Sequence, residues 1–191
     1  MVFLFKPKKK SPRARLLKRA RKLKLKRTHG DYKSDLHDIV SLYIRECSDW
    51  TCAKCGKRHP RGSGKLGASH YIGRACLIFA WDPENIDPLC WFPCHQKWES
   101  AKNTEYKVFM ICKLGEAKVH WMELCSNISN ITSLTDDEIK NMPKEYLSRL
   151  MTKMNSNEIS RYLAYFIEAY KQLCIKKGVP DLWETRKHRA S

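Results

Sequence analysis

Two pairs of cysteines constrain this chain more than any other feature of its sequence. The first pair is Cys52-x2-Cys55 and the second is Cys90-x3-Cys94, with 34 residues between the pairs. A Cys-x2-Cys turn directs both sulfurs at one ion, and a second pair completes the tetrahedral set of ligands that zinc prefers. We therefore predict a structural Zn²⁺ bound by these four cysteines, with no open coordination position.

Nine cysteines would also suit a secreted protein held together by disulfides, but the start of the chain argues against this. Its apolar residues 1–5 are too few for a signal peptide and lead directly into Lys6. We therefore expect a reducing cytoplasm, where paired cysteines bind metal, with Cys47 and Cys76 as alternative ligands. The longest apolar runs fall short of the roughly 18 residues of a membrane span, so we expect a soluble protein without a membrane partner.

The net charge of +17 is concentrated near the N-terminus. Residues 1–30 contain 13 of the 37 Lys and Arg residues and none of the 20 acidic residues. Such a block repels itself and favours a polyphosphate partner, because neutralised phosphates release counterions. We predict that residues 1–30 form a flexible DNA-binding arm; a solubilising tail, an RNA-binding arm and a membrane-surface arm are the alternatives. The arm residues that we assign to phosphate contacts are Arg13, Arg15, Lys18 and Arg19.

The remaining sequence predicts an α+β fold that is mainly helical. Apolar residues recur at helical spacing from Leu36 to Cys47, which predicts an amphipathic helix. Residues 31–125 would combine this helix with the cysteine-containing module, whose core we place at 50–104. Residues 126–191 predict a C-terminal helical region, in which Thr135-x-x-Glu138 forms a capping box.

Three polar residues within or beside the cysteine frame suit the hydrolysis of a phosphodiester. Such a reaction needs a base, a divalent cation and a group that orients the base. We assign these roles to His70 as the base, His95 as a ligand of a catalytic Mg²⁺ or Mn²⁺, and Asn85 as the group whose carbonyl holds the imidazole. Arg74 and Lys97 lie near enough in the sequence to clamp flanking phosphates; solvated surface charges are the alternative for both.

The order of these motifs resembles that of the HNH, or ββα-metal, nucleases. It includes Ser69-His-Tyr71, Trp81-Asp-Pro-Glu-Asn-Ile86 and the final Cys-x3-Cys-His. More narrowly, Ala68-Ser-His-Tyr71 and Glu105-Tyr-Lys107 are similar to the phage NinG recombination proteins, also called Rap. The resemblance covers residues 20–125. It implies a zinc-stapled module of a β-hairpin and a helix, and an endonuclease acting on Holliday junctions or D-loops in a phage-infected bacterial cytoplasm.

By position, the resemblance implies that His70 is the general base and that Asn85 is the middle Asn of the HNH motif. It implies that His95 is the last residue of the motif, which binds the metal. Two departures stand out: Ser69 replaces the Asp or His ligand of many HNH enzymes, and the second cysteine pair is longer than is common in NinG-like sequences, with His95 in place of Asn. A homing-like enzyme that cuts linear duplex and a noncatalytic zinc-containing DNA-binding accessory protein therefore stay open as hypotheses. A homodimer through the C-terminal helices would suit a symmetric four-way junction.

Three aromatic residues surround the second cysteine pair: Trp91, Phe92 and Trp98. They can pack around the zinc knuckle, or they can stack on unpaired bases at a DNA branch point. Packing is the interpretation that we favour for all three.

Overall fold

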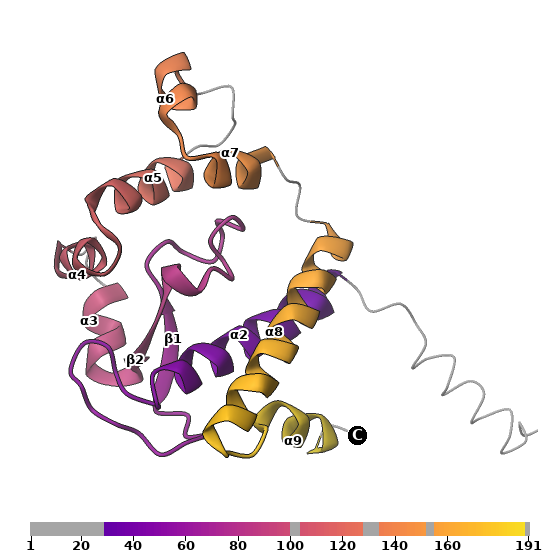
Figure 1. Ribbon diagram of the computed structural model, residues 1–191. Coiled ribbons are helices and arrows are strands. Elements are labelled where there is room, and N and C mark those ends of the chain that lie inside the picture. Colours follow the sequence, from indigo (N-terminus) through magenta and orange to yellow (C-terminus); the bar gives the residue numbers. More distant parts are fainter. Residues whose placement is uncertain (1–28, 100–103, 128–133, 152–154, 190–191) are drawn as a thin grey trace, which may run out of the picture.

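The computed structural model describes residues 29–99, 104–127, 134–151 and 155–189 (Figure 1). Most of these residues are helical, and two short strands form a small sheet, which confirms the predicted mainly helical character. The predicted arm lies outside the described residues except for its last two positions. The elements in chain order are α2 (His29–Cys47), β1 (Leu66–His70), η1 (Pro83–Asn85), β2 (Ile86–Cys90), η2 (Trp91–His95), α3 (Gln96–Glu99), α4 (Thr104–Leu114), α5 (Glu116–Asn127), α6 (Asp136–Asn141), α7 (Lys144–Met151), α8 (Ser156–Lys177) and α9 (Leu182–Arg189).

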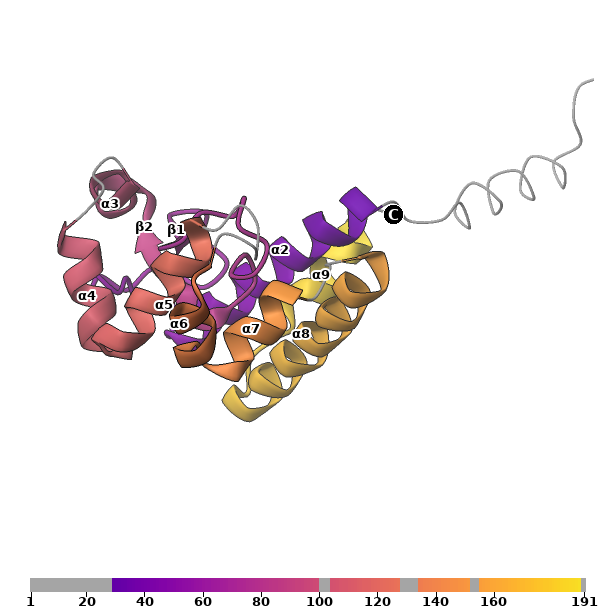
Figure 2. The ribbon, with the colours of Figure 1, turned by 90° about the horizontal axis from the view of Figure 1, so that it is seen from above.

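Helices α2 and α8 lie side by side and form the largest helix pair of the fold (Figures 1 and 2). The apolar face predicted for α2 is buried from Leu36 to Ile44, whereas Cys47 at its end is exposed. Tyr43 on α2 meets Phe166 on α8 edge to face, with 5.6 Å between ring centroids. The Asn155 side chain caps the N-terminus of α8 by accepting two backbone N–H bonds. Gly178 ends α8 in the left-handed conformation, with φ 64°, which glycine adopts without a Cβ penalty.

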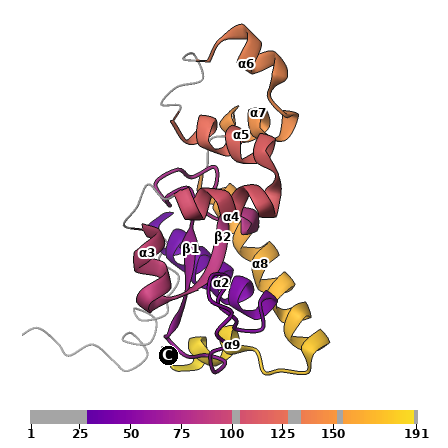
Figure 3. The same cartoon turned by 90° about the vertical axis from the view of Figure 1, so that its left-hand side faces the viewer.

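Helices α3, α4 and α5 lie on the side of the sheet away from α8, whereas α9 lies beside the end of α8 and packs near α2 (Figure 1). Figure 1 shows α3, α4, α5 and α7 following one another in an arc around the two strands, and Figure 3 shows α6 and α7 at the end opposite α9. The predicted capping box at the start of α6 is present, because the Thr135 hydroxyl accepts from Glu138 N and the Glu138 carboxylate accepts from Thr135 N. One apolar core cluster includes residues of both strands and of α2, α3, α4, α5, α7, α8 and α9, whereas α6 has no buried residue. Among the described helices none is long and apolar enough to cross a membrane.

The sheet consists of β1 and β2 in antiparallel register. Leu66 pairs with Cys90 at one end, and His70 pairs with Ile86 at the other. Every residue of β2 is buried, and α2 packs against both strands. At the cysteine end, Ala53 N donates to Pro88 O at 2.8 Å and joins the first cysteine turn to β2. The sheet therefore connects the first cysteine pair, the second pair and His70.

Arg61 anchors the loop after the first cysteine pair to both long helices. Its Nε donates to the Glu46 carboxylate at 2.9 and 3.2 Å, and its Nη2 donates to Pro180 O at 2.6 Å and to the Tyr170 hydroxyl at 3.3 Å. Glu46 is 2% exposed and also accepts from Trp50 Nε1 at 3.0 Å. A buried carboxylate needs such partners, because its desolvation is not compensated otherwise.

We predict that Arg61→Ala lowers the free energy of unfolding by about 3 kcal/mol, because it leaves the Glu46 carboxylate buried without its cation. Urea denaturation followed by circular dichroism measures the change. The matched control is Arg161→Ala, which removes an exposed ion pair with Glu158 and should change stability by less than about 1 kcal/mol. Equal midpoints for the two variants would refute the anchoring role of Arg61.

Candidate metal centre and catalytic site

The four paired cysteines converge on one point. The Sγ atoms of Cys52, Cys55, Cys90 and Cys94 all lie within 4.8 Å of one another. Thiolates around a tetrahedral zinc with Zn–S bonds of about 2.3 Å lie roughly 3.8 Å apart, so these four sulfurs fit such an ion. The cluster can therefore hold a metal ion such as zinc, while Cys47 and Cys76 lie outside it.

Local backbone structure brings the first pair into position. The turn after α2 passes through Asp49 and Trp50, whose φ angles of 52° and 59° are unusual for residues other than glycine. Trp50 is held there by its hydrogen bond to Glu46 and by the Arg45 guanidinium, which lies 5.0 Å from the indole centroid. Gly56, with φ 69°, then closes the cysteine turn by donating to Cys52 O at 3.0 Å.

His59 contacts the cluster and was not predicted from the sequence. Its Nε2 lies 3.0 Å from Cys90 Sγ, and burial lowers the pKa of this imidazole, which favours the neutral form. A neutral imidazole that donates from Nε2 to a metal-bound thiolate orients that ligand. The signal in the sequence was the spacing Cys55-x3-His59, which places the histidine on the return from the first turn.

His70 ends β1 with its imidazole held by a backbone carbonyl. Nε2 lies 3.0 Å from Ala80 O, and a carbonyl oxygen can only accept, so in the neutral ring Nε2 carries the proton and Nδ1 keeps its lone pair. Burial lowers the pKa of His70 from 6.5 to about 4, and the positive charge of Arg74 contributes in the same direction. His70 is therefore neutral at pH 7 and able to accept a proton.

Asn85 does not contact the imidazole that we expected it to hold. Its side chain is fully buried, and its Oδ1 accepts from Ile72 N at 2.7 Å while its Nδ2 donates to Ile72 O and Phe79 O, both at 2.9 Å. Asn85 thus fastens the loop that links the two strands, and the same loop presents Ala80 O to His70. The Asn85 amide therefore positions the His70 imidazole through the backbone and not by direct contact.

His70 and His95 line the same pocket, which has a volume of about 850 Å³. His95 is 7% exposed, and its ring packs on Trp91 with 4.7 Å between centroids. The wall on the opposite side comes from later helices, where Glu123 of α5 accepts from the Tyr71 hydroxyl and pairs with Lys107. Because these groups face one volume, the pocket can bring a base, a candidate metal ligand and cations to one substrate.

His37 is a second histidine that sequence reasoning missed. It lies on α2, lines the pocket and packs on Trp81 with 5.4 Å between ring centroids; its own centroid is 6.4 Å from that of His70. The signal was its position beside the buried Leu36, on the edge of the apolar face of α2.

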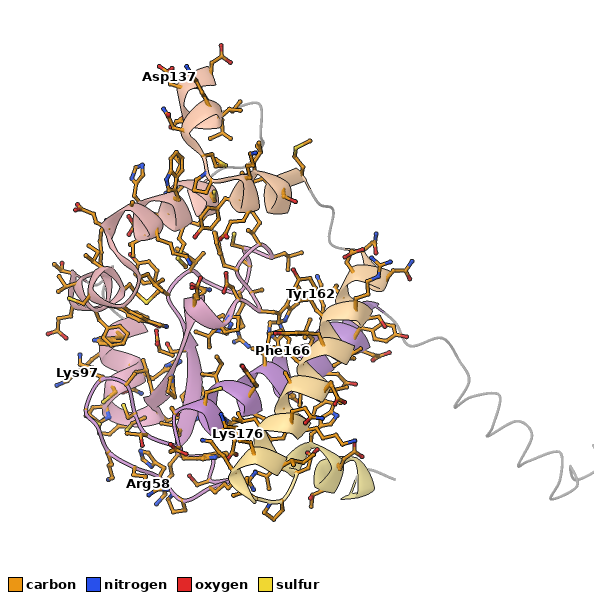
Figure 4. All side chains as sticks on the ribbon, in the orientation of Figure 1. Arg58, Lys97, Asp137, Tyr162, Phe166 and Lys176 are labelled. Atoms are coloured by element: carbon orange, nitrogen blue, oxygen red, sulfur yellow. The ribbon has the colours of Figure 1, made fainter. Side chains whose placement is uncertain are left out.

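The predicted phosphate-binding residues are placed unequally. Arg74 is exposed and lines the pocket, whereas Lys97 is exposed on α3 and projects from the edge of the molecule outside the pocket lining (Figure 4). Arg13, Arg15, Lys18 and Arg19 lie outside the described residues. Asn85 is also absent from the pocket lining.

Removal of the metal should unfold the candidate site. We expect the purified protein to contain one zinc per chain, and Cys90→Ser to lose it together with the cooperative thermal transition, because structural zinc contributes on the order of 10 kcal/mol. Metal analysis and circular dichroism measure both effects. Cys112→Ser, at an exposed position on α4, should keep its zinc; a zinc-loaded and stable Cys90→Ser protein would contradict the four-cysteine site.

The depressed pKa of His70 predicts a pH-dependent stability. The unfolded imidazole binds a proton near pH 6.5 and the folded one only near pH 4, so this stability is present above pH 6.5 and is lost as the pH falls toward 4. Between pH 7 and pH 5 the wild type should lose about 2 kcal/mol more than His70→Gln. Urea midpoints at the two pH values test this. His120→Gln, at an exposed histidine of α5, should follow the wild type.

The comparisons with known proteins fit this arrangement. The model of the family described as the Bacteriophage Lambda NinG protein matches residues 4–157. No curated protein and no solved structure matched the chain. The match covers the first cysteine turn, both strands, the second cysteine pair and the pocket, and it extends over most of the sequence. The chain therefore belongs to the NinG family of bacteriophage proteins.

Proposed function

We propose that this chain is a metal-dependent HNH endonuclease that hydrolyses phosphodiester bonds in DNA. The observation that carries the proposal is the pocket shared by His70 and His95. In this pocket the His70 imidazole is neutral, and its Nε2–H donates to Ala80 O. An imidazole that is neutral at pH 7 has a free lone pair and can accept a proton, as a general base must.

The order of elements supports the same proposal. An antiparallel pair of strands carries His70, and a helical segment starting at Trp91 carries His95 across one end of the sheet. The cysteine cluster joins the two parts, because Cys90 ends β2 and Cys94 directly precedes His95. Metal in the cluster would thus fix the spacing between base and ligand without taking part in the reaction.

In the proposed reaction, His70 Nδ1 removes a proton from a water molecule while the oxygen of that water attacks the phosphorus atom. The bond from phosphorus to the leaving deoxyribose oxygen breaks, and that oxygen takes up a proton. A bound Mg²⁺ or Mn²⁺ would supply positive charge near the phosphate. His95 lines the pocket and would offer its imidazole to such an ion, with water and the substrate phosphate as the other ligands. Among the described residues, the His, Cys, Asp and Glu side chains that lie close enough to share an ion are the four cysteines of the cluster.

DNA is the substrate that the charge distribution favours. Arg74 and Lys107 line the pocket, and residues 1–30 add 13 cations to a chain of net charge +17. We assign the substrate to branched recombination intermediates, such as Holliday junctions or D-loops, because the chain belongs to a phage family that the sequence motifs associate with recombination. A homodimer in the cytoplasm of the infected bacterium would meet such a junction symmetrically.

The accessory-protein hypothesis has one observation in its favour. Ser69 occupies the position before His70 where many HNH enzymes supply a metal ligand, and here it is 3% exposed. A serine hydroxyl is a weak ligand for a divalent cation, so the protein would then bind branched DNA through the same surface without cutting it.

Cleavage of a labelled four-way junction beside a linear duplex of matched sequence tests these hypotheses. We expect cutting of the junction only with Mg²⁺ or Mn²⁺, and a loss of at least about a hundredfold in His70→Ala, the range for removing a general base. His120→Ala is the matched control and should cut normally.

Three results would change the conclusion. Equal cutting of linear duplex would favour a homing-like enzyme. Binding to the junction without cutting would favour the accessory protein. Undiminished cutting by His70→Ala would contradict the assigned base.

A further inference from the structure

Two large aromatic side chains at the second cysteine pair face solvent. Trp91 is 55% exposed and Phe92 is 76% exposed. The packing that we favoured for both is wrong, and it is right only for Trp98, which is 5% exposed and stacks on Tyr106 with 4.2 Å between ring centroids. Because exposed aromatic area is unfavourable in water, adjacent exposed rings of this size commonly mark a surface that a ligand covers.

The indole of Trp91 is held in place at the rim of the pocket. It lies over Gly67 of β1, where a Cβ would come within 3.5 Å of the indole Cε2, and it packs on His95. Its backbone N–H donates to Lys65 O at 3.0 Å. The distance of 3.5 Å is an ordinary van der Waals contact, so the indole rests against the strand at Gly67. The indole is part of the pocket lining that includes His70.

Phe92 directly follows Trp91 in the chain and adds a second exposed ring. Its backbone is extended, with φ −134° and ψ 134°, inside an otherwise helical segment, so its side chain does not pack along a helix face. It lies between Cys90 and Cys94, which belong to the four-cysteine cluster. Metal in the cluster would therefore hold Phe92 rigidly while leaving its ring in water. A rigid exposed ring loses little conformational entropy when it binds.

The surroundings of the two rings are basic. Lys65 precedes β1 and Lys97 lies on α3, and both are exposed (Figure 4). Arg74 adds a third cation across the same pocket. Aromatic faces beside cations are the combination with which proteins bind unpaired nucleotides, since each base offers a π-face and each linkage a phosphate. In an intact duplex those base faces are already stacked on their neighbours.

We propose that Trp91 and Phe92 form a platform on which an unstacked nucleobase at a DNA branch point packs, next to the phosphate that enters the pocket. The position of that phosphate rests on the proposed function. Base stacking, however, is a binding property that can be measured without cleavage. It gives the molecule a way to prefer branched DNA over linear duplex, because only a branch offers the base face.

The experiment uses the full-length, zinc-loaded protein with His70→Ala, so that the DNA is bound and not cut. The probes are a four-way junction with 2-aminopurine at the branch point and a linear duplex of matched sequence. Phe92→Leu and Trp91→Leu keep an apolar side chain but remove the aromatic face, and Phe92→Tyr restores it. Tyr165→Leu on α8 is the matched control, because Tyr165 is an aromatic residue that is 65% exposed. Zinc content and melting temperature confirm that each variant is folded.

We expect the parent protein to quench 2-aminopurine fluorescence on the junction. Phe92→Leu or Trp91→Leu should weaken junction binding by about five- to hundredfold, the range for losing one stacked base, and should leave linear-duplex binding within about twofold. Phe92→Tyr and Tyr165→Leu should bind like the parent protein. Junction affinity and quenching that survive both leucine substitutions would overturn the platform, as would equal losses on the junction and the linear duplex.

The outcome separates this proposal from the nuclease proposal. If the protein with His70 intact cuts nothing but still quenches 2-aminopurine through Phe92, only the nuclease assignment fails. If it cuts the junction and the leucine variants bind and quench normally, only the platform fails. If one leucine variant loses its zinc, the other carries the test.

Discussion

A two-stranded sheet of five residues per strand cannot hold its own register in water, and the candidate site depends on that register. A slip by one residue would turn His70 to the opposite face. The structure fastens the sheet at both ends: the cysteine cluster holds the end where Leu66 meets Cys90, and Asn85 holds the loop beyond His70 through three backbone hydrogen bonds. The imidazole is therefore positioned by features that never touch a substrate.

Helix α2 packs against both strands and α8 packs against α2, so the two long helices tie the cysteine turn to the C-terminal half of the chain. Arg61 is central to this connection, since it reaches Glu46 of α2, Tyr170 of α8 and the carbonyl of Pro180. A chain with a sheet of this size obtains most of its core from helices, and here one apolar cluster includes residues of both long helices and both strands. Removal of the C-terminal helices would therefore remove part of the apolar core on which the site is built.

Much of this arrangement could be predicted from the sequence, and what escaped had a common cause. Regular spacing predicted α2, the capping box before α6 and the convergence of the four cysteines, because each depends on contacts a few residues apart or on one strong chemical preference. The partners of Asn85, His37 and His59 lie at distant positions, and backbone carbonyls such as Ala80 O leave no trace in a sequence pattern. Exposure of Trp91 and Phe92 depends on which neighbours fill the space beside them, which hydrophobicity alone does not report. The catalytic roles of His70, Asn85 and His95 stay predictions.

The similarity to the NinG family ends at residue 157, whereas α8 begins at Ser156 and covers one side of α2. The match to the family therefore ends before most of α8, the helix that packs against α2. A protein engineered to stop where the similarity stops would retain every residue assigned to the site, yet it would expose the flank of α2 and leave Arg61 without its contacts to Tyr170 and Pro180. In this molecule the residues that match the family and the residues that pack around the site do not end at the same position.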